Sequence, residues 1–156
     1  MARTAAPPAS ASIELHEQPG HLIRRAHQIA VALFHDNLGR EVTPVQYAVL
    51  RALQHRPGID QVTLAQEIAL DTSSTADVAV RLEAKGLIVR ELLPRGQRSL
   101  QLTAEGEALL ARLVPGMNQM CHTMLADLDG KEQADFIRLL QKFVQVNDDG
   151  RAAPRR

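Results

Sequence analysis

Two short helical patterns with almost no linker between them, followed at once by a strand–turn–strand pattern, limit what this chain can fold into. The first helical pattern is DQVTLAQEIAL, in which Leu64 and Ile68 share an inward face. The second is DTSSTADVAVRLEAKG, which Asp71 or Thr72 can cap and Gly86 can end. A tight junction between short helices, with Ser and Thr near the start of the second, is typical of a helix-turn-helix unit.

The strand–turn–strand pattern spans Gly86 to Thr103, with the sequence GLIVRELLPRGQRSLQLT. LIVREL and SLQLT have the spacing and composition of strands, and Pro94 and Gly96 supply the turn between them. A hairpin placed directly after a recognition helix is a wing. Because the turn carries arginines, the wing is predicted to bring positive charge to DNA beside the groove that the helix occupies.

Further helical patterns flank this unit, with apolar residues at spacings of three and four. QPGHLIRRAHQIAVALFHDNLG opens at Pro19 and closes near Gly39, and TPVQYAVLRALQHRPG begins with Thr43 as cap and Pro44 at the first helical position. TAEGEALLARLVPGMNQMCHTMLADL, with a bend expected at Pro115, and DGKEQADFIRLLQKFVQV follow the hairpin. The predicted fold class is therefore mainly α with a small β-hairpin wing.

One helix before the winged helix-turn-helix and two after it have apolar faces too large for a domain of this size to bury alone. The simplest way to bury them is against a second copy of the chain. Residues 15–40 and 104–147 are accordingly assigned to dimerisation, and residues 41–103 to the DNA-binding lobe. The ends, residues 1–14 and 148–156, are rich in small and polar residues and are predicted to be disordered tails.

The composition argues against several other classes of protein. The 18 Lys and Arg balance 18 Asp and Glu, which excludes a general nucleic-acid coat but not a locally basic surface. The sequence has no nucleophile motif, no glycine-rich phosphate loop and no paired carboxylates, so it gives no indication of an enzyme. The 6 histidines are scattered and a single cysteine, Cys121, accompanies them, so no metal site or cofactor is predicted. The lone cysteine, and the lack of an apolar stretch of about 20 residues, favour the cytoplasm.

The order of the elements resembles the MarR family of transcriptional regulators over roughly residues 20–146. The resemblance is carried by VTPVQYAVLRAL, VTLAQEIALDTSSTADVAVRLEAKGLIVR and SLQLTAEGEALL. It implies a homodimer with interlocked first and last helices, which binds near-palindromic promoter DNA, usually represses, and is released from DNA by small aromatic acids or phenols. The segment GHLIRRAHQIAVALF further resembles members that control the degradation of aromatic or nicotinate-type carboxylic acids.

The wing departs from the pattern of the family it resembles. The family's Asp-x-Arg-Asp-x-Arg motif corresponds to LPRGQR here, so Leu93 and Gly96 replace both aspartates. In the family these acids help to hold the arginines, and their absence predicts a looser wing. Lys85 and Arg90 add to Arg95 and Arg98 in this region, so we expect the wing to be locally basic.

Candidate DNA-binding residues lie on the helix-turn-helix and on the wing. Short hydroxyls near a helix start can contact base edges or phosphates, and Asp77 could accept a hydrogen bond from cytosine N4. The alternatives are plain helix capping by the serines and solvated surface charge for the arginines. The candidates are Thr63, Ser73, Ser74, Asp77, Arg81, Arg95 and Arg98.

A ligand site is predicted on the first helix. Burying a carboxylate requires an opposite charge and hydrogen bonds, which Arg and His supply. Arg24 and His27 are three residues apart and share one face, His21 and Arg25 are four apart and share another, and Tyr47 could add a hydroxyl or a ring wall. The alternative is that these are surface charges of a dimer interface, paired with acids of the partner.

Two mechanisms remain open at this point. In the first, the free dimer samples several spacings of its recognition helices, DNA selects one, and an aromatic carboxylic acid favours another. In the second, the protein is a winged-helix dimer without a small-molecule effector, which senses oxidants through Cys121, senses a metal, or acts as an adaptor for other proteins.

Overall fold

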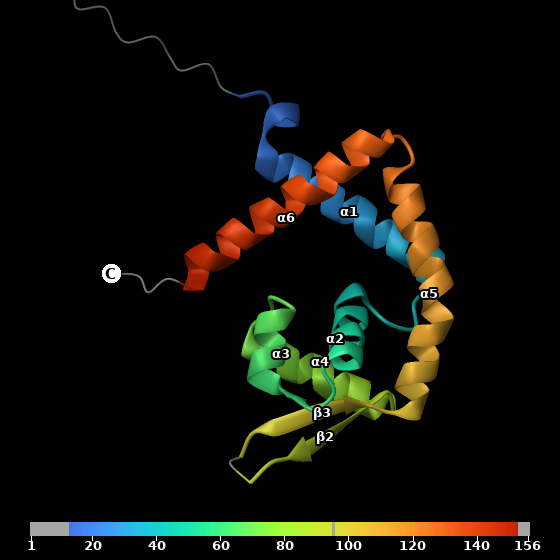
Figure 1. Cartoon of the computed structure of the whole chain (residues 1–156), viewed down its shortest axis with the longest axis vertical. Coiled ribbons are helices and arrows are strands. Elements are labelled where there is room, and N and C mark those ends of the chain that lie inside the picture. Colours follow the sequence, from blue (N-terminus) through green and yellow to red (C-terminus); the bar gives the residue numbers. More distant parts are fainter. Residues whose placement is uncertain (1–12, 95, 153–156) are drawn as a thin grey trace, which may run out of the picture.

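The structure is a computed structural model that describes residues 13–94 and 96–152 (Figure 1). It is mainly helical with a small antiparallel sheet, so the fold class predicted from the sequence is confirmed. The elements in chain order are η1 (Leu15–Glu17), α1 (Pro19–Leu38), α2 (Pro44–His55), β1 (Ile59–Asp60), α3 (Gln61–Glu67), α4 (Thr72–Ala84), β2 (Ile88–Leu92), β3 (Arg98–Leu102), α5 (Ala104–Leu125) and α6 (Gly130–Ala152).

The helices begin and end where short local signals predict. Thr43 and Gln46 form a capping box at the start of α2, with Pro44 in the first turn. Of the two candidate caps for α4, Asp71 is the one used, because its carboxylate accepts a hydrogen bond from the Ser74 backbone N–H at 2.8 Å. Gly86, with φ of 72°, follows α4 in a left-handed conformation that favours glycine.

The sheet has the order β1-β3-β2, and its short outer strand β1 was not predicted. Ile59 pairs with Leu100 and Asp60 pairs with Ser99. Two residues are too few to show the alternation that marks a strand, so only the buried position of Ile59 and the hydrogen bond from the Gly58 N–H to the Leu100 carbonyl reveal it. β1 therefore ties the loop before α3 to the base of the wing.

One hydrophobic core joins α2, α3 and α4 to the base of the wing and to the first half of α5. Its fully buried side chains include Leu50, Leu53, Leu64, Leu82, Ile88, Leu100, Leu109 and Leu110. Glycines allow two close backbone contacts along α5. A Cβ on Gly106 would lie 2.2 Å from the carbonyl oxygen of Leu87, and a Cβ on Gly116 would lie 2.5 Å from that of Asn37.

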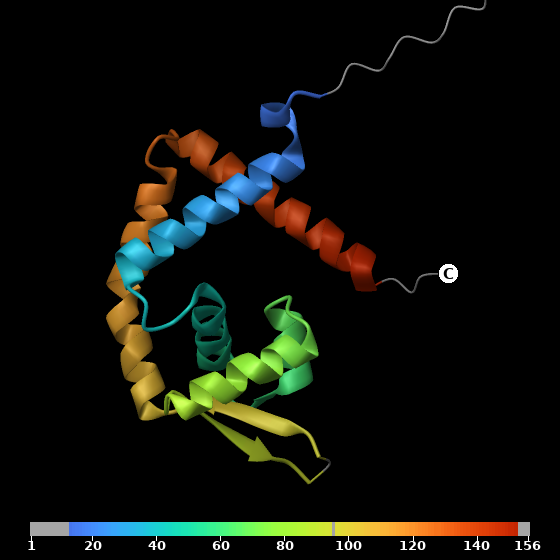
Figure 2. The same cartoon turned by 180° about the vertical axis from the view of Figure 1, so that it is seen from behind.

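The α1 helix packs along α5 and adds Phe34 and Leu38 to this core, whereas the described part of α6 has few contacts with any other element. The α5 helix is continuous through Pro115. From the far end of α5, α6 returns across the molecule (Figures 1 and 2). It extends to Ala152, beyond residue 147, the predicted end of the dimerisation segment. Within the described part of the chain, no helix is long and apolar enough to cross a bilayer.

Candidate nucleic-acid interface

The α4 helix divides into an inward face and an exposed face. Thr75, Ala79 and Leu82 are fully buried. Ser73, Asp77 and Arg81 are exposed, and Val80 and Ala84 complete that side of the helix. The structure therefore brings three of the predicted DNA-binding residues together on one solvent-facing surface.

Ser74 occupies a different position from Ser73. It is half-buried, and hydrogen bonds from its side chain and its backbone N–H lower the pKa of the Asp71 carboxyl below its usual value. Ser74 therefore takes part in the cap of α4, which agrees with the capping alternative for this residue. Ser73 is exposed, and only its backbone N–H contributes to the lowered pKa of Asp71.

Thr63 is also engaged by a cap. Its hydroxyl donates to the Asp60 carboxylate, which also accepts from the Val62 and Thr63 backbone N–H groups at 3.0 Å each. These bonds, led by the Thr63 hydroxyl, lower the pKa of Asp60. The Thr63 oxygen can still accept a hydrogen bond, but its proton is committed to Asp60.

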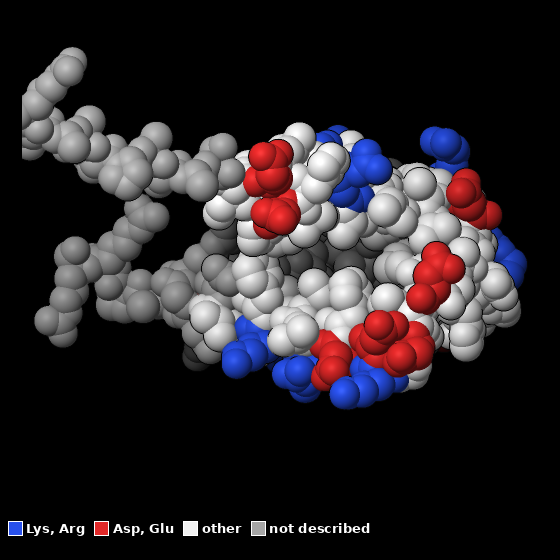
Figure 3. All heavy atoms as spheres, turned by 90° about the horizontal axis from the view of Figure 1, so that it is seen from above, with Lys and Arg blue, Asp and Glu red and all other residues white. Residues whose placement is uncertain are grey.

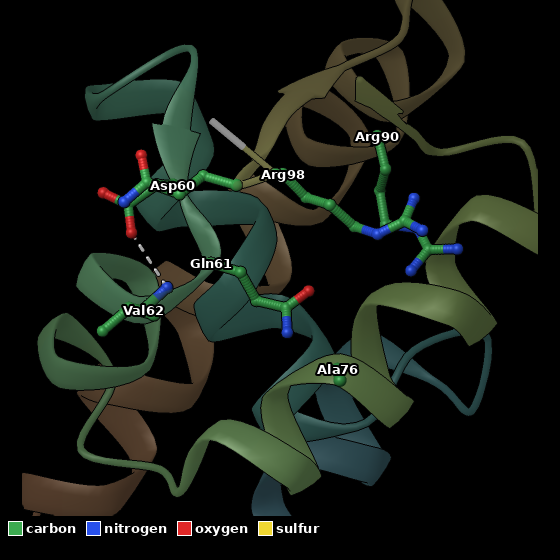
Figure 4. Close-up of a pocket in the computed structure, with 8 residues that line it drawn as sticks. Asp60, Gln61, Val62, Ala76, Arg90 and Arg98 are labelled. Atoms are coloured by element: carbon green, nitrogen blue, oxygen red, sulfur yellow. Dashed lines mark hydrogen bonds between the residues drawn. The ribbon is translucent and has the colours of Figure 1, made fainter. Parts of the chain in front are cut away.

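A hollow of about 340 Å³ lies between α4 and the wing (Figure 4). Asp60, Gln61 and Val62 line it from the start of α3, and Ala76 lines it from α4. The strands contribute Arg90 and Arg98, and the turn contributes Gly96 and Gln97. Figure 4 shows the Arg98 side chain extending from β3 toward Arg90 over this hollow. Arg95, predicted to bind DNA, lies outside the described residues.

Not all of the expected basic charge of the wing is free. Arg90 forms an ion pair with Glu83 at 2.6 Å, and its side chain is only 15% exposed. The Lys85 ammonium donates to the backbone carbonyl of Glu41 and to the Gln46 side chain. Two of the cations that we assigned to a basic wing are therefore used within the lobe. Arg98 remains exposed and has no ion pair within the described part of the chain.

Glu83 also belongs to this surface, although it was not among the predicted DNA-binding residues. A signal for it exists, because Glu83 lies in the last turn of α4 and Arg90 lies in the strand that begins just after the Gly86 turn. A reversal of the chain at Gly86 brings β2 back against the end of α4. Opposite charges on either side of such a turn can therefore meet.

The proposed ligand-binding residues do not form one site within a single chain. His21, Arg24, Arg25 and His27 lie in the first half of α1, where Arg24 bonds to Gln28 at 3.2 Å and to His21 at 3.4 Å. Tyr47 on α2 packs instead against Phe34 near the other end of α1, with ring centroids 5.9 Å apart. Ten residues of helix separate Phe34 from Arg24, a distance of about 15 Å.

His27 is the best placed of these four residues to face the lobe. It lies seven residues before Phe34, two helical turns along the same side of α1 that buries Phe34. His27 is exposed in the single chain, as are Arg24 and Arg25. Any site that includes them would be enclosed by something beyond the described chain.

The α6 helix carries more exposed large apolar side chains than any other described element. Phe136, Ile137, Leu139, Leu140, Phe143, Val144 and Val146 are each 38% to 60% exposed. On α1, Leu22, Ile23 and Ile29 are also exposed. Figure 3, seen from the end of the molecule that carries α1 and α6, shows charged side chains along the margins and uncharged ones between them, where the surface is hollowed.

The alternative sensing groups gain no support from the arrangement of the described residues. Cys121 is exposed on α5 and is not in a disulfide. No group of three or more His, Cys, Asp or Glu side chains in the described part of the chain could hold a metal ion.

Known proteins with similar sequences show which family this architecture belongs to. A model of the MarR family matches residues 41–99, the lobe that carries the helix-turn-helix and the wing. The transcriptional regulator HosA of Escherichia coli O111:H- is 34% identical over 134 residues, which cover 85% of this chain and 98% of HosA. The chain belongs to the MarR family. It is therefore a transcriptional regulator and not an enzyme.

Two solved structures of MarR-family regulators are similar over most of the chain. PcaV from Streptomyces coelicolor, solved in complex with its natural ligand, is 37% identical, with a TM-score of 0.82 over 86% of this chain and 97% of PcaV. BpsR from Bordetella bronchiseptica is 29% identical, with a TM-score of 0.80 over 86% of this chain and 99% of BpsR. The DNA binding of BpsR is regulated by 6-hydroxynicotinic acid. The regulation of BpsR by a nicotinic acid agrees with the resemblance of the first helix to regulators concerned with nicotinate-type acids.

Proposed function

We propose that this MarR-family regulator is a homodimeric repressor that binds near-palindromic promoter DNA and is released by a small aromatic carboxylic acid. The observation that carries the proposal is the pairing of an exposed polar face on α4 with Arg98 across an open hollow. PcaV and BpsR, both bound or regulated by small molecules, support the effector. We also propose that the protein acts in the cytoplasm, where promoter DNA is accessible.

The exposed helix α4 and the adjacent wing would allow the lobe to contact two neighbouring grooves of a DNA duplex. A helix such as α4 fits the major groove, and Ser73, Asp77 and Arg81 would then face base edges and phosphates. Arg98 would lie at the adjacent minor groove, whose negative potential favours a guanidinium. The strand of DNA backbone that separates the two grooves would pass through the hollow between α4 and the wing.

A homodimer would supply the second half of the interface. Two recognition helices must enter successive major grooves about 34 Å apart. The apolar faces of α6 and α1 are the surfaces that a second copy would cover, because they are exposed in the single chain and α6 has little packing on its own subunit.

Effector binding would act by shifting the spacing of the two lobes. A carboxylate held by Arg24, Arg25 or His27 would be enclosed only when the partner covers α1, so ligand and dimer geometry would be linked. A ligand shifts such an equilibrium only by the difference in its affinity for the two spacings.

Arg98→Ala is expected to weaken binding to operator and unrelated DNA by a similar factor, about tenfold, because a charge near the backbone contributes little sequence information. The slope of log K against log salt should become shallower by about 0.9 for each phosphate that the variant no longer neutralises. Fluorescence anisotropy with the DNA upstream of the gene, over a range of salt concentrations, measures both. Arg40→Ala removes an exposed arginine between α1 and α2 and is the control. Equal affinities for Arg98→Ala and the unmodified protein would refute the wing contact.

Benzoate- or nicotinate-type acids are expected to bind the protein and to release operator DNA. Loss of a charge-assisted hydrogen bond costs about 1.5–3 kcal/mol, so replacing the residue that holds the carboxylate should weaken binding by about tenfold to a hundredfold. Isothermal titration of Arg24→Ala, Arg25→Ala and His27→Ala separates the three candidates. The absence of both binding heat and DNA release with every acid tested would remove the effector from the proposal.

A further inference from the structure

A single carboxylate connects the recognition helix to the wing. Glu83, in the last turn of α4, accepts three hydrogen bonds from Arg90 of β2. They come from the Arg90 backbone N–H at 3.2 Å, from Nε at 2.8 Å and from Nη2 at 2.6 Å. Two of the three involve the planar guanidinium, and the geometry of such a pair fixes orientation as well as distance.

The pair lies at the hollow that faces the proposed path of the DNA backbone. Arg90 lines this hollow together with Arg98, although its side chain is only 15% exposed. The hydrogen bonds from the Arg90 side chain are the largest cause of the lowered pKa of Glu83, and the charge of Arg98 also lowers it. Glu83 is therefore ionised at neutral pH and lies in the field of both arginines.

We propose that Glu83 is a positioning residue for DNA recognition, which withholds Arg90 from the phosphates and leaves Arg98, among the described residues, as the cation of the hollow. An uncommitted guanidinium here would bind the backbone of any sequence, because phosphate contacts carry no sequence information. Bonded to Glu83, Arg90 instead fixes β2 against the end of α4. The pair would thus lower non-specific binding while keeping the helix and the wing in register with neighbouring grooves.

This inference rests on the proposed function, and it makes a claim that a purely structural role does not. If the pair only held the lobe together, breaking it would weaken binding to all DNA and would not add phosphate contacts. If Glu83 withholds Arg90, removing the carboxylate should strengthen binding to unrelated DNA.

Glu83→Gln is expected to increase the affinity for an unrelated duplex several-fold and to lower the ratio of operator to non-specific affinity about tenfold. The salt slope on unrelated DNA should become steeper by about 0.9 per released arginine, or about 1.8 for a dimer. Anisotropy on both duplexes across a salt series measures these quantities. Glu91→Gln is the matched control, because it removes one exposed acid from the same strand, and it should change the slope less.

The double variant Glu83→Gln with Arg90→Gln tests the assignment without changing the net charge of the lobe. Its salt slope should equal that of the unmodified protein, because the pair contributes no phosphate contact in either. A shallower slope in the double variant would show that Arg90 already binds DNA and would overturn the inference. An unchanged salt slope for Glu83→Gln on unrelated DNA would also overturn the inference. An unmodified protein that does not prefer operator DNA would instead contradict the proposed function itself.

Discussion

A protein carrying Leu140→Asp and Val144→Asp is expected to be monomeric and to lose operator binding by about a thousandfold or more. The two side chains are 42% and 52% exposed and lie one turn apart on the apolar face of α6. Carboxylates there would have to be buried without partners in any dimer that covers this face, and such burial is strongly unfavourable. A single lobe would then retain only one half-site, and its affinity would approach the non-specific range.

The control for this change places the same charges on the opposite side of the same helix. Ala134→Asp with Gln141→Asp adds two carboxylates seven residues apart at exposed positions, away from the apolar face. Light scattering after size-exclusion chromatography should show a dimer for the control and a monomer for the α6 variant. Circular dichroism should show that both are folded. A dimeric Leu140→Asp, Val144→Asp protein that binds the operator normally would mean that α6 does not join the subunits.

Leu82→Ala is expected to destabilise the protein by about 2–5 kcal/mol, since large-to-small changes in a packed core leave a cavity as well as removing apolar contacts. Leu82 is fully buried and anchors α4 to the core of the lobe. Thermal unfolding followed by circular dichroism should show a fall in Tm of roughly 5–15 °C at fixed protein concentration.

Leu92→Ala is the matched control for the core change, because the same side chain is removed from a position that is 67% exposed. It should alter Tm only slightly. If Leu82→Ala leaves Tm unchanged, α4 is not held by the core in the way that the burial of Leu82 indicates.

Much of the fold follows from local signals that the sequence displays. Thr43 and Asp71 mark helix starts through their side-chain caps, and Gly86 marks a helix end through its backbone conformation, so these boundaries of α2 and α4 were predictable. The hairpin was predictable because Pro94 and Gly96 interrupt two strand-like segments. β1 was not, since its two residues are held by pairing with β3 and carry no pattern of their own.

The candidate site was less predictable because its charges interact across the fold. From the sequence, Arg90 and Lys85 were counted among the cations of the wing that could contact DNA. The structure pairs Arg90 with Glu83 and directs Lys85 to the Glu41 carbonyl. Likewise, Thr63 was a candidate because of its hydroxyl, which Asp60 engages. Spacing along a helix shows which side chains share a face, but it does not show which of them are already satisfied by a neighbour.

The bare backbone contacts of Gly106 and Gly116 bear on how a signal could travel through this protein. At Gly106, α5 touches the backbone of Leu87, and at Gly116 it touches the backbone of Asn37 at the end of α1. At both places the atom nearest to the glycine is a backbone carbonyl oxygen, which cannot move aside by changing a side-chain rotamer. We therefore expect the DNA-binding lobe to move as one rigid body with α5 and the end of α1. Any change in the separation of the two lobes of a dimer must then arise at the interface between the subunits.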